Sequence, residues 1–134
     1  MNDSALDQHM AVVGRVLAKF VSDGLAQHDI DSRAATRFLG SEVDKKTFEN
    51  VLTWMIDEDI IRVKNMSRVS DGTMFVKSAQ LTSKGIAIVR EPTQTGDTIE
   101  KRIKSAEDDT GMYTKIGEMV GGVLAGFAKG MGSG

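Results

Sequence analysis

The chain has 134 residues, of which 40% are hydrophobic and 27% are charged, with a formal net charge of −2. This length and composition are typical of one globular domain with room for an appendage. The absence of cysteine excludes disulfides, thiolate metal sites and cysteine nucleophiles. The polar first residues lack the pattern of a signal peptide, and the longest apolar stretch is about half the ~20 residues of a membrane-spanning helix. We therefore expect a cytoplasmic protein.

The first segment predicts a long helix, because its apolar residues fall on one stripe at helical spacing. Asp3 or Ser4 can cap its start, and Gly24 marks its end. His28 is interpreted as a solvated residue near the C-terminal end of this helix rather than as a catalytic base. The stripe consists of Leu6, Met10, Val13, Leu17, Phe20, Val21 and Leu25.

Two further helices are expected before residue 60. Asp31 or Ser32 caps a short helix over 33–39, which Gly40 stops, and Asp44 caps a longer helix that runs to about Glu58. Trp54 is expected to cover the edge of the core. The buried face of the longer helix is expected to consist of Phe48, Val51, Leu52, Met55 and Ile56.

A strand hairpin is predicted next. Residues 60–66 are rich in β-branched residues, Asp71–Gly72 is a strong hairpin-turn signal, and residues 74–77 form the returning strand. Thr82 then caps a short helix over 83–90, and Pro92 closes the unit. The element order is helix, helix, turn, helix, strand, hairpin loop, strand and helix.

Two segments resemble the winged helix-turn-helix superfamily. Phe48–Arg62 resembles the end of its recognition helix and the first strand of its wing. Ala79–Ile86 contains Leu-Thr-Ser-Lys-Gly, which is similar to the signature at the end of the second wing strand. Asp59 stands where glycine is usual, and aspartate tolerates a left-handed backbone better than most residues. The resemblance implies an α+β, mainly helical fold: a winged helix-turn-helix with a long N-terminal helix and an appended glycine-rich C-terminal helix, as in small bacterial or phage proteins.

The expected organisation has three parts: a winged-helix domain over 1–92 with its core at 31–90, a polar linker over 93–111 with an isolated helical patch at 98–107, and an amphipathic helix over 112–134. Each glycine inside a helix costs about 0.5–1 kcal/mol relative to alanine, so several in one helix indicate close helix–helix packing. The helix is expected to pack on the first helix of its own chain or of a second one. An alternative is weak membrane-surface contact through residues 112–131. Oligomerisation is assigned to Gly122, Gly126, Gly130 and Phe127.

Charge is unevenly distributed. Residues 60–90 carry six basic side chains against one acidic side chain, whereas residues 31–59 carry four against seven. The resemblance implies that the third helix enters the DNA major groove and that the wing contacts the backbone or minor groove. Glu49 is expected to face outward with the candidates on that helix. The candidate DNA-binding residues are Lys45, Lys46, Asn50, Thr53, Arg62, Lys64, Asn65, Arg68 and Lys77.

No enzyme signature is present, and no catalytic residue, cofactor or metal ligand is assigned. The favoured hypothesis is a homodimeric, transcriptional-regulator-like protein that binds double-stranded DNA mainly through the wing. The alternative is a protein-interaction or assembly module without DNA binding, with its interface on the first and last helices.

Overall fold

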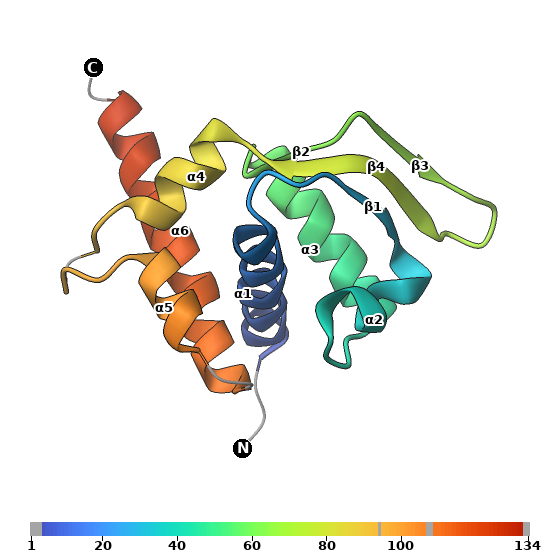
Figure 1. The fold of residues 1–134 in the computed structure, drawn as a ribbon, viewed down its shortest axis with the longest axis horizontal. Coiled ribbons are helices and arrows are strands. Elements are labelled where there is room, and N and C mark those ends of the chain that lie inside the picture. Colours follow the sequence, from blue (N-terminus) through green and yellow to red (C-terminus); the bar gives the residue numbers. More distant parts are fainter. Residues whose placement is uncertain (1–3, 94, 107–108, 133–134) are drawn as a thin grey trace.

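A computed structural model describes residues 4–93, 95–106 and 109–132, with side chains described as far as residue 127. The fold is α+β, mainly helical, with a small antiparallel sheet (Figure 1), which confirms the expected fold class at that level. The helices are α1 (Ala5–Asp23), the short 3₁₀ helix η1 (Ser32–Ala34), α2 (Ala35–Leu39), α3 (Lys45–Asp57), α4 (Ser83–Arg90), α5 (Ile99–Ser105) and α6 (Thr110–Gly132). The strands are β1 (His28–Asp31), β2 (Ile61–Arg62), β3 (Asn65–Arg68) and β4 (Met74–Leu81).

Helix α1 begins and ends as the sequence predicts. Ser4 and Asp7 form a reciprocal capping box, which satisfies two backbone amides of the first turn, and Gly24 ends the helix with a φ of 67°. The predicted stripe is wrong at both ends, because Leu6 is 67% exposed and Leu25 is 61% exposed. Leu25 lies beyond the last helical turn, and Leu6 lies in the first turn, where the core does not cover it.

Strand β1 was not predicted, and it corrects the interpretation of His28. The His28 ring is not solvated: its side chain is 17% exposed and lies edge-on to Phe20 and Phe38, with ring centroids 5.2 and 5.4 Å away. Its Nε2 is 3.2 Å from a carboxylate oxygen of Asp23 at the end of α1. His28 therefore joins β1 to the core beside α1.

The caps predicted for α3 and α4 are also confirmed, whereas Asp31 caps the 3₁₀ helix η1, and α2, with Ala34 at its N-cap position, has no side-chain cap. The side chains of Asp44 and Thr82 accept hydrogen bonds from the first turns of α3 and α4, and Gly40 ends α2 in a left-handed conformation. Asp59 follows α3 with a φ of 61°, the left-handed backbone for which glycine is usual. Trp54 lies half-buried against the core, as expected.

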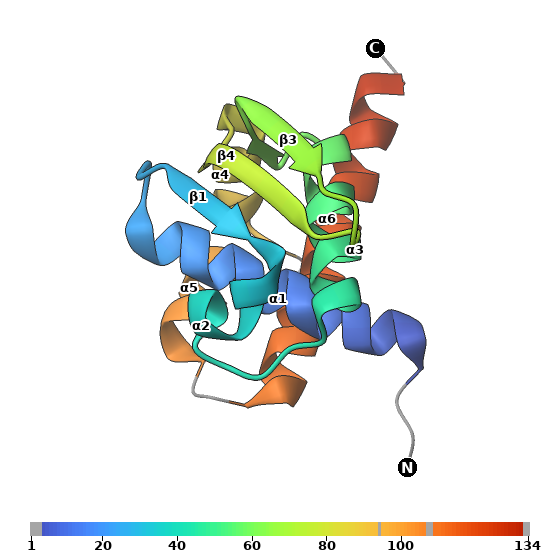
Figure 2. The same ribbon diagram turned by 90° about the vertical axis from the view of Figure 1, so that its right-hand side faces the viewer.

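The sheet is centred on β4, which extends four residues beyond the predicted 74–77 and pairs with every other strand. β1 lies along one side of it, and β2 and β3 lie along the other. β3 and β4 form the hairpin, in which Asn65 is paired with Lys77 and Arg68 with Met74. Figure 2 shows β1, β4 and β3 side by side.

Helix α6 packs along α1, as expected for a C-terminal docking helix (Figure 1). At the crossing, a Cβ on Gly14 would overlap the carbonyl oxygen of Tyr113, and a Cβ on Gly117 would overlap that of Met10. Arg15 reinforces the contact, because its guanidinium lies 4.4 Å from the centroid of the Tyr113 ring. Within the described residues, no helix is both long and apolar enough to cross a membrane.

One hydrophobic core joins all of these elements. Side chains of α1 and α3 meet those of the sheet, and α4, α5 and α6 contribute to the same cluster. From α6 and α5, the fully buried members are Ile99, Ile116 and Val120. The core therefore extends from the sheet to the last helix.

Candidate nucleic-acid interface

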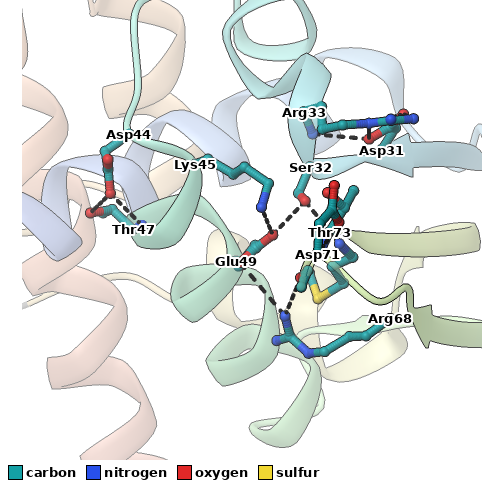
Figure 3. A network of polar contacts seen from close by, with 12 residues as sticks. Asp31, Ser32, Arg33, Asp44, Lys45, Thr47, Glu49, Arg68, Asp71 and Thr73 are labelled. Atoms are coloured by element: carbon teal, nitrogen blue, oxygen red, sulfur yellow. Dashed lines mark hydrogen bonds and ion pairs between the residues drawn. The ribbon is translucent and has the colours of Figure 1, made fainter.

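The candidates on α3 differ in exposure. Lys46 and Asn50 are exposed and, four residues apart, lie on the same helix face. Thr53 is half-buried, and its hydroxyl donates a 2.9 Å hydrogen bond to the carbonyl of Glu49 in the preceding turn. Lys45 reaches back towards the sheet rather than out from the helix (Figure 3). Among the candidates on α3, only Lys46 and Asn50 therefore present polar groups to solvent on its outer side.

The candidate cations of the hairpin and of β2 before it are exposed. Arg62, Lys64, Arg68 and Lys77 are all exposed, as is Asn65. The backbone amide of Lys64 donates a 2.9 Å hydrogen bond to the carbonyl of Lys77, so the two lysines are neighbours across the hairpin. In the part of the chain that the structure describes, neither lysine has an ion-pair partner.

Arg62 is held in place by a neutral side chain. Its guanidinium donates two hydrogen bonds, of 2.8 and 3.2 Å, to the side-chain oxygen of Gln80 on β4. Gln80 in turn donates a 2.6 Å hydrogen bond to the carbonyl of Leu25. Because the partner is a neutral amide, it does not compensate the positive charge of Arg62 at the base of the hairpin.

Glu49 does not face outward, which corrects the expectation from the sequence. It is 2% exposed and accepts a 2.5 Å hydrogen bond from the Ser32 hydroxyl of η1. Its carboxylate oxygens also lie 3.3 Å from the Lys45 Nζ and 3.6 Å from the Arg68 Nη1. Figure 3 shows these three partners converging on it from α3, η1 and the hairpin.

The Glu49 carboxyl is held in its charged form. Burial alone would raise its pKa, but the hydrogen bond from Ser32 and the positive charges of Lys45 and Arg68 together outweigh burial and lower the pKa below its usual value. Ser32 Oγ also accepts a 2.9 Å hydrogen bond from the backbone amide of Met74. Two of the predicted DNA-binding cations thus neutralise an acid of the protein itself.

Further acidic side chains flank this face. Asp31 pairs with Arg33 at 2.9 Å, and the hydrogen bonds from Arg33 lower the pKa of Asp31. Asp71 accepts a 2.9 Å hydrogen bond from the Thr73 amide at the hairpin turn. Positive potential is therefore greatest along the strands of the hairpin and weaker at its turn.

A groove of about 680 Å³ lies on another part of the molecule, between α6 and the turn after α4. Gly122, Gly126 and Phe127 line it, so three of the four residues assigned to oligomerisation lie together there. Gly130 lies outside the residues whose surroundings the structure describes. Among the described residues, no group of three or more His, Asp or Glu side chains is placed to hold a metal ion.

No protein family, no curated protein and no solved structure was found to match this chain. What it does is therefore inferred from its own residues. The residue that the sequence interpretation missed is Glu49, and a signal for it exists. Glu49 lies about 60° from Leu52 and about 20° from Ile56 on the helical wheel, at the edge of the apolar stripe, where an acidic side chain is rare unless it is paired.

Proposed function

We propose that the chain is a non-enzymatic winged-helix protein of the transcriptional-regulator type that binds double-stranded DNA, chiefly through the hairpin. The order α1, β1, α2, α3, β2 and a β3–β4 hairpin supports the proposal, since winged helices share it. In this arrangement α3 is the helix that enters the major groove and the hairpin is the wing.

The observation that carries the proposal is the pair of exposed, unneutralised lysines on the hairpin, Lys64 and Lys77. Lysine and arginine side chains displace counterions from phosphates, and this sequence-independent contribution dominates the affinity of weak DNA binding. Arg62 adds a third cation at the base of the same hairpin. On α3, Lys46 contributes one more cation and Asn50 an amide that can read an adenine.

The test is binding of a random-sequence duplex, measured by fluorescence anisotropy between about 50 and 200 mM monovalent salt. Replacing Lys64 and Lys77 together by glutamine removes two phosphate contacts. We expect the slope of log affinity against log salt to fall by about two, because each contact contributes about 0.9.

A matched control exists on α5, where Lys101 and Lys104 are also exposed. Their replacement by glutamine changes the net charge equally but leaves the hairpin intact. Wild-type protein that fails to bind at the lowest salt contradicts the proposed function. An equal loss in both double variants contradicts the assignment to the hairpin.

A second candidate function is self-assembly through the groove face of α6. A Cβ on Gly122 or Gly126 would meet no atom within 4 Å, so this face is open, and Met119 and Phe127 lie beside it half-buried. Light scattering of the full chain tests the assignment. A dimer that Gly122→Glu converts to a monomer supports it, and a monomeric wild-type chain contradicts it.

A further inference from the structure

We infer that Glu49 occupies the place of a DNA phosphate: it holds Lys45 of α3 and Arg68 of the hairpin, and so limits how many cations this face offers to a duplex. The inference rests on the proposed function and concerns its regulation by the protein's own charge.

The geometry is that of a phosphate contact inside the protein. Two cations from separate elements meet one carboxylate, with Lys45 on Oε2 and Arg68 on Oε1. Ser32 supplies a hydroxyl donor to Oε2 as well. Lysine, arginine and hydroxyl donors are also the groups that bind phosphate oxygens of DNA.

The three charged side chains differ in exposure: Glu49 is buried, whereas Lys45 and Arg68 are partly exposed to solvent. The Glu49 side chain is 3% exposed, whereas those of Lys45 and Arg68 are 41% and 45% exposed. Glu49 is also anchored by Ser32, whose Oγ is bound to the backbone of β4. The cations can therefore turn towards solvent while the carboxylate stays in place.

The contact also joins the two elements that the proposed function assigns to DNA. Glu49 and Lys45 belong to α3, and Arg68 lies on β3 close to the hairpin turn. A duplex that recruited either cation would have to compete with Glu49. Binding by the wild-type protein should consequently be weaker, and less dependent on salt, than the number of basic side chains on this face implies.

The test compares the wild-type chain with Glu49→Gln on one random-sequence duplex. Glutamine keeps the length of the side chain and can still accept the hydrogen bond from Ser32, but it removes the negative charge that holds Lys45 and Arg68. The remaining partner of Arg68 is the neutral carbonyl of Gly72, 3.1 Å from its Nη1. Each released cation that reaches a phosphate steepens the salt slope by about 0.9 and tightens binding about fivefold to tenfold at 0.1 M salt. We expect Glu49→Gln to bind at least about fivefold more tightly.

Asp57→Asn is the matched control, since Asp57 is exposed at the far end of α3 and the substitution changes the net charge equally. We expect it to change the affinity less than about twofold. Adding Arg68→Gln to Glu49→Gln should remove about one unit of the gained slope. A purely structural role for Glu49 predicts lower stability with no gain in affinity.

The outcomes separate the inference from the proposed function. Equal binding by the wild type and Glu49→Gln overturns the inference and leaves the proposed function standing. An equal gain in Asp57→Asn also overturns the inference, because net charge alone then explains it. If none of these proteins binds DNA, the proposed function is wrong and the inference falls with it.

Folding of the variants is checked by circular dichroism, and Glu49→Met is a second uncharged replacement of similar length. If neither variant folds, the inference is tested on the wild-type chain by NMR of its carboxyl groups. Saturating duplex should then raise the pKa of Glu49, because DNA takes Lys45 and Arg68 away from Glu49. An unchanged pKa of Glu49 overturns the inference.

Discussion

The direction in which a single side chain points, that of Glu49, changes the functional interpretation of the whole face. Outward-facing, it would repel phosphates from α3; buried, it takes two cations away from them. Charge counts along the sequence include Arg68 among the six basic residues of 60–90, but they cannot show that its charge is cancelled from another helix. Asp59, by contrast, was expected in a left-handed backbone, because it stands where glycine is usual in the family that the segment resembles.

The buried charge of Glu49 makes the stability of the protein depend on pH. Its pKa is lowered by folding, so its contribution to stability is fully present above the ordinary glutamate pKa of about 4.3 and is lost as the pH falls through the folded-state value. We expect the difference in unfolding free energy between the wild type and Glu49→Gln to shrink on acidification. Urea unfolding at several pH values measures it.

The comparison isolates Glu49 from its acidic neighbours, since Asp31 and Asp71 titrate in both proteins. A difference that grows as the pH falls from 7 to 3 would contradict the assignment of the charge to Glu49.

At the scale of elements, the helix caps could be predicted from the sequence, but the residues that make the close contacts between elements could not. Ser4, Asp44 and Thr82 cap helices as expected, because their hydrogen bonds depend on residues three positions away. β1 was missed because it is four residues long and mostly polar, and it is a strand only through its pairing with β4. The glycine spacing predicted a close helix contact but not which glycine makes it.

The glycines of α6 separate into two classes that substitution can distinguish. Gly117→Ala places a methyl group against the Met10 backbone of α1, and we expect a loss of about 1–3 kcal/mol. Gly122→Ala meets no atom within 4 Å, and we expect a gain of about 0.5–1 kcal/mol from the better helix former. Thermal unfolding, followed at one protein concentration, measures both.

Gly14→Ala, across the same crossing, should resemble Gly117→Ala because it meets the Tyr113 backbone. Similar stabilities of the Gly117 and Gly122 variants would show that α1 and α6 do not cross this closely.

At the scale of the whole molecule, the sequence suggests a domain, a linker and an appended helix. In the structure, side chains from all three segments pack into one hydrophobic core. The segment 93–111 is polar along most of its length, yet it contains α5, whose Ile99 is fully buried. α6 supplies Ile116 and Val120 to the cluster that also holds the side chains of α3. Polarity along the chain indicates exposure, but it does not show which apolar faces meet.

Because the core is continuous, we expect a single cooperative unfolding transition. The only tryptophan, Trp54, lies on α3, away from α6, so its fluorescence reports on one side of the core while circular dichroism reports on all helices. The two midpoints should coincide. Ile116→Ala should lower the Trp54 midpoint, with a loss of about 2–5 kcal/mol.

Ala125→Ser is the control on α6, because Ala125 is exposed. If circular dichroism falls before the fluorescence changes, α6 unfolds on its own and the three-part organisation expected from the sequence is correct.

The packing of α6 on α1 also sets the order in which the protein can mature during synthesis. Arg15 and Thr110, which share a hydrogen bond, are 95 residues apart. At about 5–20 residues per second, α1 leaves the ribosome roughly 5–20 s before the helix that covers it. During that interval the apolar face of α1 has no native partner from α6, which makes the nascent chain a candidate for chaperone binding.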